Sequence, residues 1–216
     1  MKVFTKTAFA FAAGIVAACA QAGVDPASLP LEKLTADVVV VGSGGTGMAA
    51  AASAAGEGAK VLVFEKLPMI GGRSAFAGGA IAAGNTKAQA RAGEKDTTPE
   101  GFAKIWLDDQ KRSYHGGNPN FPDEAHVRSM TASFTETIDW LEETVGHTFA
   151  KPRPFGYGGP NYAHAPAESP VPASGRGSSP AGGRFVIKNV KIYLDKLGVP
   201  VRTSTPVDSL IMDDKG

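Results

Sequence analysis

The spacing of apolar residues predicts a βαβ unit early in the chain. Residues 34–41 are apolar at nearly every position, a pattern typical of a parallel strand that is buried on both faces. Residues 45–57 are rich in alanine and predict a closely packed helix. The apolar run 60–65 predicts a second strand, which ends on Glu65. Strand, helix and strand in this order indicate an α/β fold with a parallel sheet.

Apolar residues at helical spacing recur further along the chain. Helices are predicted over 100–114, 123–145 and 185–196, and strands over 199–204 and 209–212. One apolar stripe of the second helix is interpreted as core, because a stripe of Met and aromatic residues is usually core and seldom a cofactor site. Its members are Val127, Met130, Phe134, Ile138 and Leu141.

Two stretches lack such a pattern. Residues 85–98 are polar and are expected to form a surface connection. Residues 150–183 are dense in Gly, Pro and Ser and are expected to form a long loop that is either functional or disordered. His164 in that loop is interpreted as a histidine with satisfied hydrogen bonds, with a substrate contact as the alternative. The other histidines are expected at the surface or as helix caps, namely His115, His126 and His147.

The first 22 residues have the pattern of a secretory signal peptide. Lys2 and Lys6 precede the apolar run 8–18, and Ala20-Gln21-Ala22 forms a cleavage site. The apolar run is too short to cross a bilayer as a helix, so no transmembrane segment is predicted. The alternative is an N-terminal helix of the mature fold. Cleavage predicts an exported protein, periplasmic in a bacterium.

Cys19 is the only cysteine, so no internal disulfide is possible. Residues 16–19 also resemble a bacterial lipobox, which would make Cys19 the lipidated N-terminus of a lipoprotein. The preferred interpretation is that Cys19 is lost with the signal peptide. The predicted organisation is a signal peptide at 1–22, a linker at 23–33 and one domain over 34–216.

Composition and charge exclude some classes of partner and site. The chain is 43% hydrophobic and 20% charged, with a formal net charge of +1. A nearly neutral chain does not favour nucleic acid or an anionic membrane as a partner. No group of His, Cys, Asp and Glu has metal-ligand spacing, so no metal site is predicted.

Three glycines join the first strand to the first helix with G-x-G-x-x-G spacing. Gly42 allows a sharp turn, Gly44 lets the backbone approach a pyrophosphate, and Gly47 lets the helix pack close to the strand. The phosphates would lie at the helix N-terminus, where free N–H groups and the helix dipole favour negative charge. Glu65 follows eighteen residues after Gly47, where a carboxylate can bind ribose hydroxyls and would repel a 2′-phosphate. This arrangement predicts a dinucleotide site.

The residues after Glu65 identify the dinucleotide by resemblance. Glu65-Lys66 is followed by the diglycine Gly71-Gly72, then by Ser74, and then by a second diglycine, Gly78-Gly79. This sequence resembles the FAD-binding domain of the fumarate reductase and succinate dehydrogenase flavoprotein family. It is most similar to the soluble, exported fumarate and urocanate reductases related to flavocytochrome c.

The resemblance implies a set of FAD contacts. Those expected at the pyrophosphate are Gly42, Ser43, Gly44, Gly45 and Gly47. Those expected at the adenosine ribose are Glu65 and Lys66. Those expected along the phosphates and ribityl chain are Gly72, Arg73 and Ser74, although family members often have Asn in place of Arg73. Those expected along the isoalloxazine ring are Ala77, Gly78, Gly79 and Ala80. The backbone of Val207 is expected to support the adenine.

The resemblance also implies an activity. Flavin N5 would pass a hydride to the double bond of an α,β-unsaturated carboxylate, such as fumarate or a related small acid. An external donor, such as a cytochrome, would supply the electrons. The resemblance covers roughly the N-terminal half of a family member, and residues 213–216 predict a hairpin turn without its return strand. The substrate domain and all catalytic residues are therefore expected beyond Gly216, and this chain alone is expected to be inactive.

Three alternatives to this function stay open. A steroid-ring dehydrogenase shares the FAD motifs but uses a tyrosine base. A truncated gene product would have no catalytic activity and would not retain FAD. A protein that binds a nicotinamide dinucleotide is the third.

Overall fold

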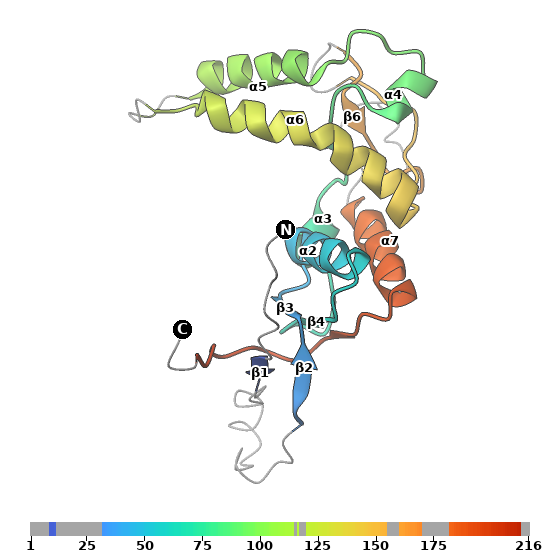
Figure 1. The fold of residues 1–216 in the computed structure, drawn as a ribbon. Coiled ribbons are helices and arrows are strands. Elements are labelled where there is room, and N and C mark those ends of the chain that lie inside the picture. The colour runs from blue at the N-terminus through green and yellow to red at the C-terminus, as the bar shows by residue number, and fades with distance from the viewer. Residues whose placement is uncertain are drawn as a thin grey trace, which may run out of the picture. The chain divides into compact units, whose positions relative to one another are not determined.

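The computed structural model describes residues 9–11, 32–114, 116, 120–154, 160–169 and 182–212. The predicted hairpin at 213–216, His115 and all of the predicted signal peptide except 9–11 lie outside these residues. Figure 1 shows the elements, which are β1 (Phe9–Phe11), β2 (Leu34–Ala36), β3 (Val38–Val41), α2 (Gly45–Gly56), β4 (Val61–Phe64), α3 (Gly72–Phe76), β5 (Ile81–Ala82), α4 (Lys87–Arg91), α5 (Pro99–Ser113), α6 (Glu124–Trp140), the π-helical turn η2 (Leu141–Val145), β6 (Ala163–His164), α7 (Gly183–Lys196) and β7 (Val201–Arg202). The chain forms two compact units, Met1–Ala75 with Val190–Gly216, and Phe76–Asn189.

A parallel three-stranded sheet forms the centre of the first unit. The strand order is β3-β4-β7, with Val38 opposite Val61 and Val63 opposite Val201. All four residues of β4 are buried, because β4 has a strand on each side and α2 packs against it and against β3 (Figure 1). The buried face of α2 consists of Met48 and three alanines. The predicted α/β fold with a parallel βαβ unit is confirmed.

The first strand differs from the prediction in two ways. It is interrupted at Asp37, because the backbone N–H groups of Asp37 and Val38 both donate to Lys60 O, at 2.9 and 3.2 Å. The Asp37 carboxylate accepts in turn from the Lys60 N–H at 2.8 Å. Burial on both faces is also wrong, since Val41 is 58% exposed. Within the described residues β3 is an edge strand, which leaves it less covered than β4.

The C-terminal strands also differ from the prediction. Strand β7 ends at Arg202, and Ser204 then adopts a positive φ of 51°, which a strand cannot continue through. The strand predicted at 209–212 is not formed. In this part of the described chain Leu210, Ile211 and Met212 are 65%, 73% and 58% exposed and pair with no strand. An apolar run needs a hydrogen-bonded neighbour before it becomes a strand.

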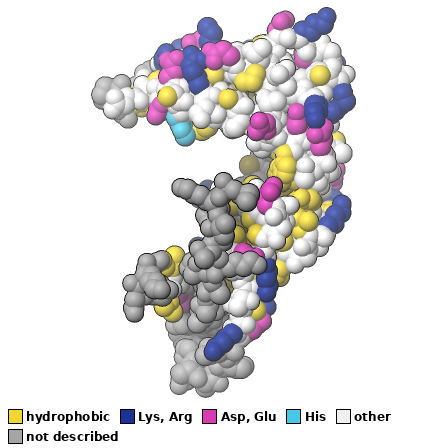
Figure 2. All heavy atoms as spheres, in the orientation of Figure 1, with side chains coloured by type: hydrophobic (Ala, Val, Ile, Leu, Met, Phe, Trp, Pro, Cys, Tyr) yellow, Lys and Arg dark blue, Asp and Glu magenta, His cyan; other side chains and the backbone are white. Residues whose placement is uncertain are grey.

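Two helices, α5 and α6, lie side by side in the second unit (Figure 1). Each begins at a polar cap, because Thr98 accepts from the Gly101 N–H and Asp123 accepts from the His126 N–H. Acidic and basic side chains are interspersed over this pair of helices (Figure 2). The predicted helices over 100–114 and 123–145 are confirmed, with the second ending in η2. The helix predicted over 185–196 is confirmed as α7.

Aromatic rings link this helix pair to the segment around β6. The Phe102 ring centroid lies 5.7 Å from that of Trp106 and 5.2 Å from that of Tyr162. Phe102 and Tyr162 are buried, as are Val127 and Ile138 of the predicted apolar stripe. The core interpretation of the stripe agrees with this packing.

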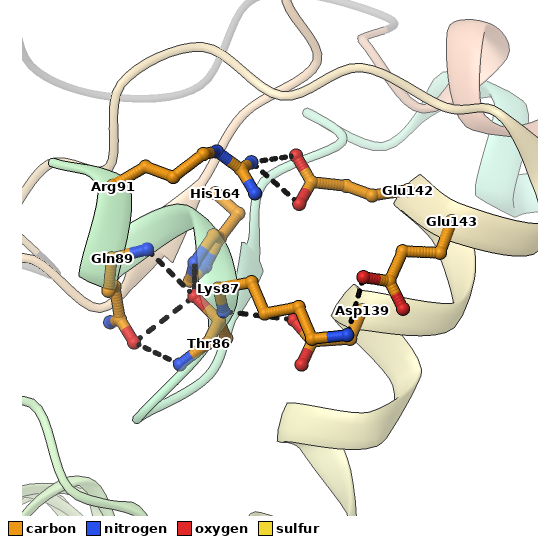
Figure 3. A network of polar contacts seen from close by, with 8 residues as sticks. All are labelled: Thr86, Lys87, Gln89, Arg91, Asp139, Glu142, Glu143 and His164. Atoms are coloured by element: carbon orange, nitrogen blue, oxygen red, sulfur yellow. Dashed lines mark hydrogen bonds and ion pairs between the residues drawn. The ribbon is translucent and has the colours of Figure 1, made fainter.

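The surface connection predicted at 85–98 is only partly correct, because this segment mixes exposed residues with buried ones. Thr86 and Gln89 are each only 1% exposed, and they form a capping box at the start of α4. The Gln89 amide donates to Ala83 O and to Asn161 O, both at 2.8 Å, and its oxygen accepts from the Thr86 N–H at 2.9 Å (Figure 3). These polar side chains can be buried because the network satisfies their hydrogen bonds.

Replacing Gln89 should therefore destabilise the second unit. Gln89→Ala removes the amide group that donates to both carbonyls, and it leaves the Thr86 N–H unsatisfied. We therefore expect the free energy of unfolding to fall by about 2 kcal/mol. Chemical denaturation measures the change. Glu136→Ala, at an exposed position of α6, is the control and should change stability by less than about 0.5 kcal/mol. An equal, small effect of both variants would contradict the network.

The long loop predicted at 150–183 contains regular structure where it is described. Strand β6 pairs antiparallel with β5, with His164 opposite Ile81. Isolated bridges join Phe149 to Pro166 and Arg153 to Ala163. Within the described residues, this segment is therefore held by backbone pairing rather than structureless.

Candidate functional site

The turn between β3 and α2 needs glycine at two positions for different reasons. Gly42 has a φ of 96°, which favours glycine, and its N–H donates to Phe64 O at 2.7 Å. Gly47 has an ordinary backbone, but a Cβ there would lie 2.0 Å from Gly42 O. The helix and the strand thus approach each other too closely for any side chain at Gly47.

The N-terminus of α2 is open toward a ligand. Gly44 occupies the N-cap position without a capping side chain, and the first turn contains no acidic residue. A Cβ at Gly44 would meet no protein atom within 4 Å. Helix N-termini have free N–H groups and partial positive charge, so this open turn fits the phosphates of a dinucleotide.

Glu65 lies directly after β4 and is held by three hydrogen bonds. Its Oε2 accepts from the Ser43 N–H at 2.8 Å and from Ser43 Oγ at 2.7 Å, and its Oε1 accepts from the Leu67 N–H at 2.9 Å. Burial by itself would raise the pKa of the Glu65 carboxyl, but these bonds from Leu67 and Ser43, with Lys66 nearby, lower it overall. Glu65 is therefore an ionised acceptor although it is only 6% exposed.

The first diglycine packs against the glycine-rich turn. Gly71 forms a parallel bridge with Gly44, and its N–H donates to Ser43 O at 2.9 Å. Ser74 Oγ, in α3, accepts from the Gly45 N–H at 3.1 Å. The structure thus brings together the predicted residues of the turn, of the strand end and of α3. Two further predicted residues, Lys66 and Arg73, are exposed beside them.

The segment with Val207 is fixed next to Glu65. The Thr205 N–H donates to Glu65 O at 2.8 Å, and the Ser204 N–H donates to Leu67 O at 2.9 Å. Val207 packs against the buried cluster that contains Leu62 and Phe64. These contacts keep the segment beside the strand end that carries the ribose-binding candidate.

The second diglycine belongs to the second unit and lies against another glycine pair. The Gly183 N–H donates to Ala77 O at 2.8 Å. A Cβ at Gly79 would lie 2.5 Å from Gly182 C, and one at Gly182 would lie 2.2 Å from Gly78 O. The sequence analysis assigned no role to Gly182, although the diglycine Gly182-Gly183 was an available signal. The sequence does not show that Gly182 contacts Gly78, which lies about 100 residues earlier.

Two histidines of the second unit are buried. His164 contacts Thr86 Oγ1 through Nε2 at 2.8 Å (Figure 3). Its Nδ1 lies 3.2 Å from Ile81 O. A carbonyl only accepts, so Nδ1 carries the proton and the neutral ring accepts at Nε2. His164 therefore has satisfied hydrogen bonds, as predicted. The prediction for His147 is wrong, because it is 1% exposed and its Nδ1 lies 2.7 Å from Asn189 Nδ2.

The stability of the protein should fall as the pH is lowered from about 7.5 to 5.5. Burial lowers the pKa of both His147 and His164. In this range the unfolded state takes up protons, near its ordinary pKa of about 6.5, and the folded state takes up fewer because its histidine pKa values are lowered. Each histidine then lowers the free energy of unfolding by up to about 1.4 kcal/mol for each pH unit. The free energy of unfolding, measured with denaturant at each pH, should depend less steeply on pH in His164→Asn than in the wild type. In His126→Asn, at an exposed position, its pH dependence should be unchanged. An equal pH dependence of the free energy of unfolding in the wild type and both variants would contradict a buried neutral imidazole.

Within the described ranges, no three His, Cys, Asp or Glu side chains are grouped to hold a metal ion. None of the helices described is long and apolar enough to cross a membrane.

Comparison with known proteins gives matches over most of the chain. The family model of the FAD binding domain matches residues 37–216. Fumarate reductase (cytochrome) of Shewanella frigidimarina is 32% identical over 182 residues, which make up 84% of this chain and 28% of that protein. Urocanate reductase of Eggerthella lenta is 31% identical over 180 residues, which make up 83% of this chain and 27% of that protein. The chain thus spans less than a third of the length of these curated relatives.

A solved structure is similar as well. It is a 3-ketosteroid-delta4-(5alpha)-dehydrogenase from Rhodococcus jostii RHA1 in complex with 4-androstene-3,17-dione, with a TM-score of 0.63 and 28% sequence identity. The match covers 84% of this chain and 40% of that one.

Proposed function

This chain belongs to the FAD-binding domain family, and from this premise we propose that it is the cofactor-binding part of an FAD-dependent oxidoreductase. The family and its cofactor, FAD, agree with the prediction from the sequence. The observation that carries the proposal is the open N-terminus of α2 at Gly44 together with the ionised carboxylate of Glu65, joined by Ser43. The first is complementary to a pyrophosphate and the second to ribose hydroxyls.

The proposed FAD contacts are those expected from the resemblance. The turn residues Gly42, Ser43, Gly44, Gly45 and Gly47 would hold the pyrophosphate. Glu65 and Lys66 would hold the adenosine ribose, and the backbone of Val207 the adenine. The remaining contacts would be Gly72, Arg73 and Ser74 at the phosphates and ribityl chain, and Ala77, Gly78, Gly79 and Ala80 along the isoalloxazine ring.

The proposed substrate is a small α,β-unsaturated carboxylate of the fumarate type. When bound and reduced by an electron donor, the flavin would supply a hydride at N5 for such a double bond. The described residues bind and orient the cofactor, and none of them is assigned a catalytic role. The substrate class is supported by the two curated relatives, which are named for the reduction of fumarate and urocanate.

A steroid-ring dehydrogenase is the second candidate. It is supported by the likeness to the Rhodococcus jostii dehydrogenase, whose structure is a complex with a steroid. This chain matches 40% of that dehydrogenase, against 28% and 27% of the two reductases. The two candidates share the FAD site and differ in the substrate.

Reconstitution and turnover test the proposal. The purified protein is titrated with FAD and followed by the visible flavin spectrum. Turnover is then measured with a reduced dye as electron donor and fumarate or urocanate as acceptor, and with a 3-ketosteroid and an oxidised dye. FAD binding is the expected result for this chain, and reduction of an unsaturated acid is expected of a longer protein that adds the substrate domain. Steroid turnover alone would favour the second candidate, and failure to retain FAD would support the truncated, non-catalytic product. A colourless protein that cannot be reconstituted would contradict the cofactor site.

We also propose export of the mature domain. The signal-peptide pattern of residues 1–22 supports a periplasmic or otherwise exported protein, with 23–33 as a linker to a domain over 34–216. A periplasmic donor such as a cytochrome would then supply the electrons. Mass spectrometry of the mature N-terminus distinguishes cleavage after Ala22 from acylation at Cys19. An intact Met1 in protein from the native host would contradict both.

A further inference from the structure

Ser43 lies in the glycine-rich turn, but its side chain faces Glu65 rather than the open helix end. The residue is completely buried. Its N–H and its Oγ both contact Glu65 Oε2, at 2.8 and 2.7 Å. An ionised carboxylate only accepts hydrogen bonds, so the Ser43 hydroxyl is the donor in its hydrogen bond with Glu65. The Gly71 N–H approaches the same Oγ from the other side, at 3.3 Å.

The three donors determine which oxygen of Glu65 is left for a ligand. A carboxylate has about four lone-pair sites on its two oxygens. Ser43 occupies both sites of Oε2, and the Leu67 N–H occupies one site of Oε1. Oε1 therefore retains one acceptor site, and its direction is fixed because Oε2 cannot rotate away from Ser43.

We infer that Ser43 is a positioning residue for the adenosine ribose, whose hydroxyl fixes Glu65 Oε2 so that Oε1 can accept from a ribose hydroxyl. The inference rests on the proposed function and refines it, because the loop serine then contributes to FAD binding through Glu65. The alternative is a direct contact of the Ser43 hydroxyl with the pyrophosphate. In the structure that hydroxyl has no exposed surface and already donates to a charged acceptor.

The charged groups around Glu65 are few among the described residues. Lys66 follows it in the chain and acts on its charge. From β7, Arg202 lies alongside, but its guanidinium is paired with Glu32. The first turn of α2 carries no charged side chain, and Arg73 of α3 is exposed. Burial is the largest influence and raises the pKa of Glu65, and the hydrogen bonds of Leu67 and Ser43 are the main interactions that oppose it.

This arrangement predicts a specific pH dependence of FAD binding. Glu65 accepts a stronger hydrogen bond from the ribose when it is ionised, so FAD affinity should weaken as the pH falls through the pKa of Glu65. Removing the Ser43 hydroxyl removes a bond that favours the ionised form. In Ser43→Ala the acid midpoint of FAD affinity should move to higher pH, and the Kd at neutral pH should rise roughly tenfold.

The test is a double-mutant cycle with FAD titrations of the full chain between pH 4 and 8. The proteins are the wild type, Ser43→Ala, Glu65→Gln and the double variant. Because Ser43 acts through Glu65, replacing it in the Glu65→Gln background should change the Kd by less than about twofold. Ser74→Ala is the matched control. It removes a hydroxyl from the same site that does not touch Glu65, so the acid midpoint should stay in place whatever happens to the affinity.

The outcomes separate this inference from the proposed function. A wild-type protein that binds no FAD would remove the proposed function itself. FAD binding with additive effects of the two substitutions, or with an unchanged midpoint in Ser43→Ala, would overturn the role of Ser43 alone. Should Ser43→Ala not fold, Ser43→Cys takes its place, because it keeps nearly the same volume but donates only weakly.

A measurement on the wild type needs no variant. The amide proton of Ser43 donates to Glu65, so its NMR shift should follow the titration of that carboxylate. A Ser43 amide shift that stays flat while Glu65 titrates would overturn the inference.

Discussion

Gly44→Ala is expected to weaken FAD binding by roughly ten- to a hundredfold while the protein stays folded. Gly44 has φ −67° and ψ 176°, an extended backbone that alanine adopts freely. The added methyl group would meet no protein atom within 4 Å. It would instead occupy the space at the N-terminus of α2 that the pyrophosphate must enter, and overpacking against the ligand costs about 1–3 kcal/mol.

Two measurements on Gly44→Ala separate binding from folding. FAD titration gives the change in Kd. Denaturant unfolding of the apoprotein should give a free energy changed by less than about 1 kcal/mol, because alanine restricts the unfolded chain but is less favourable than glycine at an N-cap. Ala50→Ser, at an exposed position of the same helix, is the control and should bind FAD like the wild type. An unchanged Kd in Gly44→Ala would mean that the cofactor does not approach this turn.

Gly47→Ala should have the opposite signature, with loss of stability as the primary effect. A Cβ at this position would lie 2.0 Å from Gly42 O and 3.3 Å from Val40 Cγ1. The first contact is with backbone, which cannot rotate away, so α2 must shift from β3. We expect the free energy of unfolding to fall by about 3 kcal/mol, at the upper end for overpacking. FAD binding should weaken as a consequence, since the turn that would hold the phosphates is displaced.

Denaturant unfolding of the apoprotein measures this effect without the cofactor. Gly44→Ala is the matched comparison, because it adds the same methyl group three residues away in the same turn. Equal unfolding midpoints for the two variants would contradict the close approach of helix and strand at Gly47.

The sequence predicts elements well where the signal is local. Helices α2, α5 and α7 and strand β4 agree with the prediction to within one or two residues, because the apolar residues that predict them lie inside the segments themselves. The glycine spacing likewise predicts the turn at Gly42 and Gly47. The proximity of Glu65 to this turn follows from the parallel pairing of β3 with β4.

The errors concern residues whose environment is supplied by distant parts of the chain. Gln89 is polar but buried, because the carbonyl of Asn161 accepts from its amide. The run 209–212 is apolar but exposed, because among the described residues no strand pairs with it. The hydrogen-bond partner of the Ser43 hydroxyl could not be predicted from the motif, since that partner, Glu65, follows a different strand. Periodicity contains no information about such long-range partners.

The order of strands also has a consequence for the newly synthesised protein. Val63 of β4 pairs with Val201, so one edge of β4 is completed only after the whole second unit has left the ribosome. At a translation rate of 5–20 residues per second, the intervening stretch of about 140 residues takes on the order of 10 s. During this time the apolar strand Val61–Phe64 has an open edge, which can pair with other chains. Aggregation during synthesis should therefore begin at β4, and a chaperone that covers this strand would protect the nascent chain.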